Sequence, residues 1–140
     1  MSKLILYTDG AARGNPGPAA LGIVLTDAKG NEIEALGETI GRATNNEAEY
    51  HALLRGLERA RHHHATELEI RTDSQLLAQQ LKGAYRVRAE NLKPLNIQAQ
   101  RALAQFARVA IHHVPRAQNG RADALANQAL DRAAVDPTGF

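Results

Sequence analysis

The chain of 140 residues contains no cysteine and no tryptophan, and aromatic residues make up only 4% of it. The lack of cysteine excludes disulfides, thiolate zinc sites and cysteine nucleophiles, and it is typical of a cytoplasmic protein. With so few aromatic side chains, the core must be aliphatic, built from Ala, Leu, Ile and Val. The hydrophobic fraction of 44% is sufficient for one such core.

The sequence also has no long hydrophobic run. None approaches the roughly 20 residues that a membrane helix requires, so we expect no contact with membranes. Met1, Ser2 and Lys3 lead directly into strand-like sequence, which is not typical of a signal peptide. The length suits one domain, and we expect residues 1–140 to form it, with 135–140 as an irregular tail.

Neither sign of charge is in large excess. The 17 basic and 15 acidic residues give a net charge of +2, which does not by itself indicate a nucleic-acid partner. One basic cluster has only Glu90 as a counter-charge, and its members are Lys82, Arg86, Arg88 and Lys93. Such a cluster can contact phosphates, although a solvated loop explains the charges equally well.

Hydrophobic periodicity predicts the order β-β-β-α-β-α-α-β-α. The strands are predicted at 3–8, 19–26, 32–40, 66–72 and 109–114, and the helices at 44–61, 74–81, 91–107 and 119–133. The continuous apolar run at 3–8 is typical of a central strand, while glycine and proline predict an ordered turn over 10–18. Thr44 and Glu47 fit a capping box at the start of the first helix. Three hairpin-linked strands followed by βα units predict an α/β fold with a mixed sheet and helices on its faces.

Two aspartates follow predicted strands. Asp9 comes directly after the first strand, and Asp73 comes after the fourth. Taken singly, Asp9 is explained equally well as a turn residue and Asp73 as a helix cap. If the first and fourth strands are parallel neighbours, however, both carboxylates lie at the C-terminal edge of the sheet, where open sheets bind ligands.

Two further acids lie on predicted helices. Glu49 shares a helical stripe with Leu53 and Leu57, so it is directed toward the core, and the capping box does not require it. Asp123 lies in the first turn of the last helix, where the helix dipole alone favours an acid. Both can reach the same sheet edge. Carboxylates about 4 Å apart repel by on the order of 4 kcal/mol, so such a cluster needs raised pKa values or bound cations. An all-oxygen set favours Mg²⁺ or Mn²⁺ over zinc.

Short motifs run along nearly the whole chain. They are YTDGA at 7–11, GNPGP at 14–18, TNNEAEY at 44–50, TDS at 72–74, ENLKPLN at 90–96, HVPR at 113–116, Asn119, AD at 122–123 and LAN at 125–127. In this order they resemble the type 1 ribonuclease H family, also called ribonuclease HI. A single Thr-Asp-Gly would be weak evidence, whereas the ordered set is highly specific.

The resemblance implies a ribonuclease H-like fold whose five-stranded mixed sheet has strands 1–3 antiparallel and strands 4 and 5 parallel to strand 1. It implies an endonuclease, monomeric by default, that cuts the RNA strand of RNA–DNA hybrids. The residues that match the catalytic, metal-binding acids are Asp9, Glu49, Asp73 and Asp123. They would hold two Mg²⁺ ions, for which Mn²⁺ can substitute, one activating the attacking water and the other stabilising the leaving oxygen. The products would carry 5′-phosphate and 3′-hydroxyl ends.

The resemblance also implies substrate contacts. Asn15 and Asn45 match positions near the RNA strand, and an amide can both donate to and accept from a 2′-hydroxyl. Arg42 and Thr44 match positions that hold a phosphate of the DNA strand.

The chain departs from the family pattern in two places. The loop before Asp123 lacks the histidine that many members use for product release, and Arg116 is the candidate substitute, as in a branch found in some bacteria and archaea. Arginine can bind phosphate but cannot shuttle protons. The chain also lacks the tryptophan-rich basic protrusion that clamps the hybrid in many members. The basic cluster would provide a smaller contact, so we expect weaker and strongly salt-dependent binding.

The remaining histidines are interpreted as structural. Residues 62–64 are all histidine and fall at the end of the first helix, where cations are favourable and adjacent side chains diverge by about 100°. His112 and His113 alternate on a strand, and neither matches the missing loop histidine, so neither is assigned to the site. Phe140 is expected to tie down the tail.

Three alternatives remain open from the sequence: a hybrid-binding module without catalysis, another nuclease or polynucleotidyl transferase of the same fold, and a metal-binding protein unrelated to nucleic acid. The presence of all four acids disfavours an inactive module. Asn15 and Asn45 favour RNA over DNA as the substrate.

Overall fold

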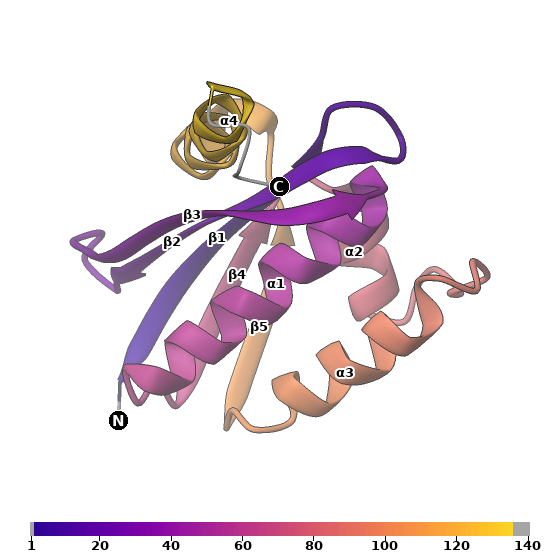
Figure 1. The fold of residues 1–140 in the computed structure, drawn as a ribbon. Helices are drawn as coiled ribbons and strands as arrows, with labels where there is room; N and C mark the ends of the chain where they lie inside the picture. The colour runs from indigo at the N-terminus through magenta and orange to yellow at the C-terminus, as the bar shows by residue number, and fades with distance from the viewer. Residues whose placement is uncertain (1, 136–140) are drawn as a thin grey trace.

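A computed structural model describes residues 2–135 of the chain (Figure 1). Its strands are β1 (Lys3–Ala12), β2 (Gly17–Asp27), β3 (Glu32–Ala43), β4 (Glu67–Thr72) and β5 (Arg108–His113). Its helices are α1 (Asn45–His62), α2 (Gln75–Leu81), α3 (Lys93–Leu103) and α4 (Gly120–Val135), with a short 3₁₀ turn, η1 (Arg116–Asn119), before α4. This order confirms the predicted one.

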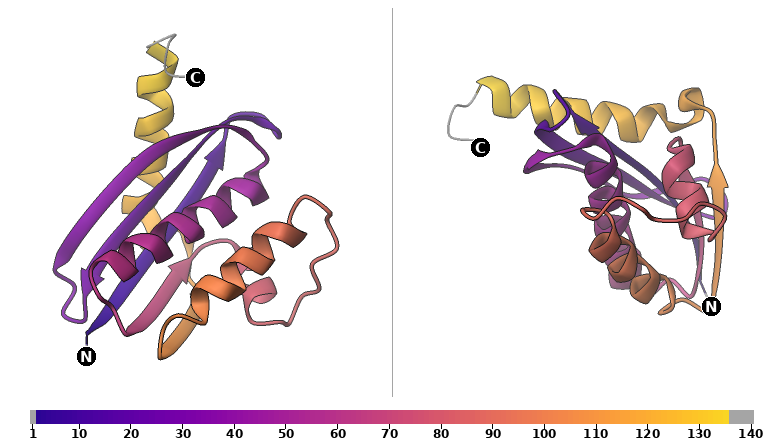
Figure 2. Two further views of the ribbon diagram at one scale, coloured as in Figure 1. Left: turned by 60° about the horizontal axis from the view of Figure 1, so that its bottom comes forward. Right: turned by 90° about the vertical axis from the view of Figure 1, so that its right-hand side faces the viewer.

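The strands form one mixed sheet in the order β3-β2-β1-β4-β5. β1 to β3 are antiparallel, and β4 and β5 run parallel to β1, as predicted. β1 is central because its apolar residues are covered on both faces: α1, α2 and α3 lie on one side of the sheet and α4 on the other (Figure 2). The predicted α/β fold class is confirmed.

The core on the α1 side consists of aliphatic side chains, among them Leu6, Leu53 and Leu57, which are all fully buried. Tyr50 is the large aromatic exception, 1% exposed. Its hydroxyl donates to Gln80 Oε1 at 2.6 Å and accepts from Asn96 Nδ2 at 3.1 Å, so one buried hydroxyl joins α1, α2 and α3.

The layer between the sheet and α4 is much thinner. It contains Ala20, Ala126, Ala129 and Leu130. Small side chains of this kind bring the axis of α4 close to the strands, and this proximity matters for the acid that α4 carries.

Most boundaries differ from the predictions by a few residues, and three of the differences bear on the site or on the helices. β1 continues to Ala12, because its pairing with β2 extends to Ala12 opposite Ala19, and only residues 13–16 turn. The predicted helix at 91–107 is shorter, Lys93–Leu103, with Pro94 in its first turn as expected. The predicted last helix begins as η1 and becomes α-helical at Gly120. No helix within residues 2–135 is long and apolar enough to cross a membrane. Phe140 and its tail lie outside the described residues.

Candidate active site

The parallel pairing of β1 and β4 brings the first two acids together. Thr8 is paired with Thr72, and Asp9 and Asp73 are the next residues on each strand. The pairing of β1 with β4 therefore stops just before Asp9. Asp9 is still paired with Gly22 of β2, so it lies within β1 and not at its end. Ser74, not Asp73, is the N-cap of α2, its Oγ accepting from Leu77 N at 3.1 Å. The helix-cap explanation of Asp73 is thus wrong.

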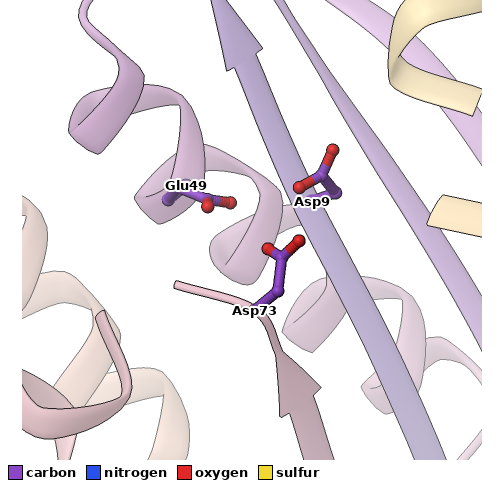
Figure 3. Close-up of side chains that lie close together, drawn as sticks. All are labelled: Asp9, Glu49 and Asp73. Atoms are coloured by element: carbon purple, nitrogen blue, oxygen red, sulfur yellow. The ribbon is translucent and has the colours of Figure 1, made fainter. Parts of the chain in front are cut away.

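Glu49 reaches these aspartates from α1 because Gly10 lets the helix touch the strand. A Cβ at Gly10 would overlap the backbone of Ala48 and Glu49. In this close approach Gly10 N donates to Glu49 Oε1 at 2.6 Å. Figure 3 shows the carboxylates of Asp9, Glu49 and Asp73 directed toward one another from β1, α1 and the end of β4. One oxygen of each lies within 4.8 Å of the others.

Burial and mutual repulsion dominate the electrostatics of this group. Burial, followed by the charges of Glu49, Asp73 and Asp123, raises the pKa of Asp9 from 3.8 to about 9. Burial is also the main cause that raises the pKa of Glu49 from 4.5 to about 8, with Asp73 and Asp123 adding to it and the Gly10 hydrogen bond opposing it. Oxygen ligands held this close fit divalent metal binding, since a bound cation removes the repulsion.

Asp123 is placed by contacts that span the sheet. Cβ atoms at Gly22 of β2 and Gly37 of β3 would overlap the backbone of Ala122 and Leu125, so these glycines let α4 lie directly on the strands. Gly22 is paired with both Asp9 and Gly37, so α4 approaches the sheet in the row of Asp9 itself.

Two asparagines fix the start of α4. Asn119 is 1% exposed, and its Nδ2 donates to the carbonyl oxygen of Thr8, the residue before Asp9, at 2.8 Å. Asn127 Nδ2 donates to Asp123 Oδ1 at 3.3 Å and to Asp123 O at 3.0 Å. Asp123 remains outside the tight group of three carboxylates but faces the same hollow.

That hollow is open and has a volume of about 530 Å³. It is lined by all four acids together with Asn45, Asn127, His113 and Arg116 among others. Arg116 is 80% exposed, and its Nη2 lies 3.8 Å from Asp123 Oδ1, a loose ion pair that leaves the guanidinium available. His113 also lines this hollow, a position that the sequence did not indicate.

The predicted substrate-binding residues cluster beside the hollow. Thr44 forms the predicted capping box, accepting from Glu47 N at 3.1 Å while its own N donates to Glu47 Oε1 at 2.8 Å. Asn15 Oδ1 accepts from Asn45 N at 3.0 Å, and Asn45 Oδ1 accepts from Ala12 N at 3.1 Å. Arg42 is exposed and its Nη2 donates to Pro16 O at 3.4 Å.

The histidine tract at 62–64 lies away from these residues, at the end of α1. His63 is the C-cap, and its Nε2 lies 2.8 Å from Glu34 Oε1. Arg59 binds the other oxygen of Glu34 at 2.9 Å. Through Glu34, these contacts link the end of α1 to β3, so His63 has a structural role.

The sheet and its acids define an α/β fold with an acidic cluster that fits divalent metal binding at the C-terminal edge of its central strands. Residues 7–129 match the family described as Reverse transcriptase-like. The chain is 51% identical to ribonuclease HI of Halobacterium salinarum over 127 residues, covering 91% of this chain and 64% of that protein. It is 44% identical to the "Bifunctional protein Rv2228c" of Mycobacterium tuberculosis, covering 94% of this chain and 36% of that protein.

Solved structures of RNase H1 proteins have the same fold as this chain. The RNase H1 of Halobacterium salinarum has a TM-score of 0.92 at 50% identity, with 94% of this chain and 99% of that chain covered. A complex of LC11-RNase H1 with RNA/DNA hybrid has a TM-score of 0.89 at 41% identity, with 93% and 98% covered. The chain belongs to the ribonuclease HI family. It spans less than two thirds of the length of these two curated relatives.

Proposed function

We propose that this chain is an endoribonuclease that hydrolyses the RNA strand of RNA–DNA hybrids. The observation that carries the proposal is the convergence of Asp9, Glu49 and Asp73, whose oxygens lie within 4.8 Å of one another in an open hollow. Membership of the ribonuclease HI family supports hybrid as the substrate, as does the likeness to a relative in complex with RNA/DNA hybrid.

In this proposal the four acids would hold two Mg²⁺ ions, for which Mn²⁺ can substitute, and such a pair would supply activation of a water and stabilisation of the leaving 3′ oxygen. Burial and mutual repulsion raise the pKa values of Asp9 and Glu49, and a nearby cation would offset both effects and favour the charged carboxylates. Asp123 joins them from the opposite face of the sheet. The products carry 5′-phosphate and 3′-hydroxyl ends.

Arg116 is the candidate for contact with the reacting phosphate. Its guanidinium lines the hollow, is mostly exposed and is tethered only loosely to Asp123. A planar donor of this kind binds phosphate oxygens in pairs. Since an arginine side chain cannot shuttle protons, Arg116 would hold the phosphate or the product without moving one.

Recognition of RNA is assigned to the two interlocked asparagines. Asn15 and Asn45 both use their side-chain oxygen to accept a backbone N–H. Because Oδ1 of each already accepts one hydrogen bond, Nδ2 is the more available group, and we propose that each donates to a 2′-hydroxyl oxygen. This sharpens the expectation from the sequence, which left both directions open.

The DNA strand would be held by cations on either side. Arg42 and Thr44 are proposed to hold one DNA phosphate, from the exposed end of β3 and the start of α1. Arg86, Arg88 and Lys93 line a second hollow of about 580 Å³ with Val87, which suits further phosphates. We also propose that the chain forms one catalytic domain of a monomeric enzyme that acts in the cytoplasm.

The experiment that tests the proposal compares matched RNA–DNA, RNA–RNA and DNA–DNA duplexes of one sequence, each with Mg²⁺, Mn²⁺ or EDTA. We expect cleavage of the RNA–DNA hybrid with either metal and none with EDTA. Cleavage of DNA–DNA, or binding of the hybrid without any cleavage, would replace the proposal with another nuclease or a binding module.

A further inference from the structure

His113 occupies a place at the sheet edge that the family resemblance does not explain. The parallel register pairs Thr8 with Thr72 and Thr72 with His113, and paired residues project from the same face of a sheet. The residues that follow Thr8 and Thr72 are the acids Asp9 and Asp73. His113 is thus the third member of the row immediately before the acids, and it is one of the residues that line their hollow.

The backbone at this point is fixed while the imidazole is available. Val114, which follows, is 8% exposed, and its N donates to Thr72 O at 2.9 Å. The side chain of His113 itself is exposed, and within residues 2–135 it takes part in no side-chain hydrogen bond or ion pair. A residue that is rigidly placed, exposed to a functional hollow and unused by the fold is suited to contact a ligand.

The neighbouring residue on the strand, His112, has a structural contact instead. His112 alternates to the other face of β5, and its Nε2 lies 3.5 Å from Glu69 Oε1. Glu69 in turn binds Arg71, at 2.6 Å. His112 does not line the hollow. Of the two adjacent histidines, His112 therefore has a contact within the fold, whereas His113 lies at the site.

The chemistry of the hollow indicates what His113 binds. The four acids supply its negative charge, and His113 and Arg116 supply donors that need an acceptor outside the protein. We propose that His113 is a substrate-binding residue whose imidazole N–H donates to a backbone phosphate oxygen of the bound nucleic acid, beside the phosphate that Arg116 contacts. Every protonation state of imidazole retains at least one N–H donor, so the contact does not depend on titration. The inference rests on the proposed function, since it assigns a contact to the same substrate.

The test compares His113→Ala with His112→Ala in steady-state cleavage of an RNA–DNA hybrid and in hybrid binding measured by fluorescence anisotropy with EDTA. We expect His113→Ala to raise KM and the dissociation constant by about tenfold, the loss of one phosphate hydrogen bond. We expect kcat and the Mg²⁺ concentration for half-maximal activity to stay within about twofold, because oxygen, not imidazole, is the ligand that Mg²⁺ prefers. His113→Gln, which keeps an N–H donor, should recover part of the loss, and His112→Ala should match the unmodified protein.

Unchanged KM and binding in His113→Ala would overturn the inference. An equal loss of hybrid binding in His112→Ala would also overturn it. A shifted Mg²⁺ requirement in His113→Ala would overturn it too, because His113 would then be a metal ligand. If the unmodified protein binds hybrid without cutting it, the proposed function fails, but the anisotropy comparison still decides the role of His113. Melting temperatures of both variants are recorded so that a loss of folded protein is not read as a loss of binding.

Discussion

Replacing Glu49 with glutamine should stabilise the metal-free protein, although the residue belongs to the proposed site. The pKa of Glu49 is about 8 in the folded protein against an ordinary 4.5. The folded state therefore retains a proton that the unfolded state has lost, and stability falls as the pH rises from about 4.5 to about 8. At pH 7 the difference spans about two and a half pH units, which at 1.36 kcal/mol per unit amounts to about 3 kcal/mol.

Glu49→Gln removes this cost and keeps an oxygen to accept from Gly10 N. We expect the free energy of unfolding with EDTA to rise by about 3 kcal/mol at pH 7 and to be nearly unchanged at pH 4.5. Added Mg²⁺ should stabilise the unmodified protein and have a smaller effect on the variant, because one ligand is lost. Urea unfolding followed by circular dichroism at both pH values, with and without Mg²⁺, measures all of these quantities.

Glu47→Gln is the matched control, two residues earlier on the same helix. The backbone N–H of Thr44 lowers the pKa of Glu47, so its charge stabilises the fold above its ordinary pKa and this contribution is lost as the pH falls. This variant should be slightly less stable at pH 7, the opposite direction. If Glu49→Gln also loses stability at pH 7 without metal, the carboxylate is a net stabilising group and the reasoning is refuted.

Three further variants test other parts of the account. Asp73→Asn should abolish hybrid cleavage while preserving or raising the metal-free melting temperature, and a large loss of stability would restore a structural role. Arg116→Ala should lower hybrid cleavage by about 10- to 100-fold, the worth of a charged hydrogen bond, with an unchanged melting temperature; unchanged kinetics would remove it from the site. Asn119→Ala should lower the free energy of unfolding by about 1–3 kcal/mol, because the buried carbonyl oxygen of Thr8 loses its hydrogen-bond donor. It should also slow hybrid cleavage, because α4 is then held less firmly against β1. Chemical denaturation measures the first effect and hybrid kinetics the second.

Three acids could be predicted from local pattern. Glu49 stood out because a charged residue occupied the buried stripe of α1, and that stripe is confirmed by the full burial of Leu53 and Leu57. Asp9 and Asp73 could be brought together once βα topology implied parallel neighbours. The close approach of α1 at Gly10 was not predicted, although a glycine in a strand is its visible signal.

The rest depended on contacts between distant segments. Asp123 reaches the site because Gly22 and Gly37 admit α4, and the sequence shows these glycines without showing which helix they face. For His112 and His113, alternation gives opposite faces but does not say which face meets the acids. The assembled structure shows that His113, and not His112, lines the hollow with the acids.

Strand-resolved cleavage of one RNA–DNA hybrid, labelled separately on its two strands, tests the central claim most directly. With Mg²⁺ the account predicts that the RNA strand is cut and the DNA strand stays intact, that EDTA stops the reaction and that Asp9→Asn abolishes it. Cutting of the DNA strand, cleavage that survives EDTA, or full activity in Asp9→Asn would contradict the account.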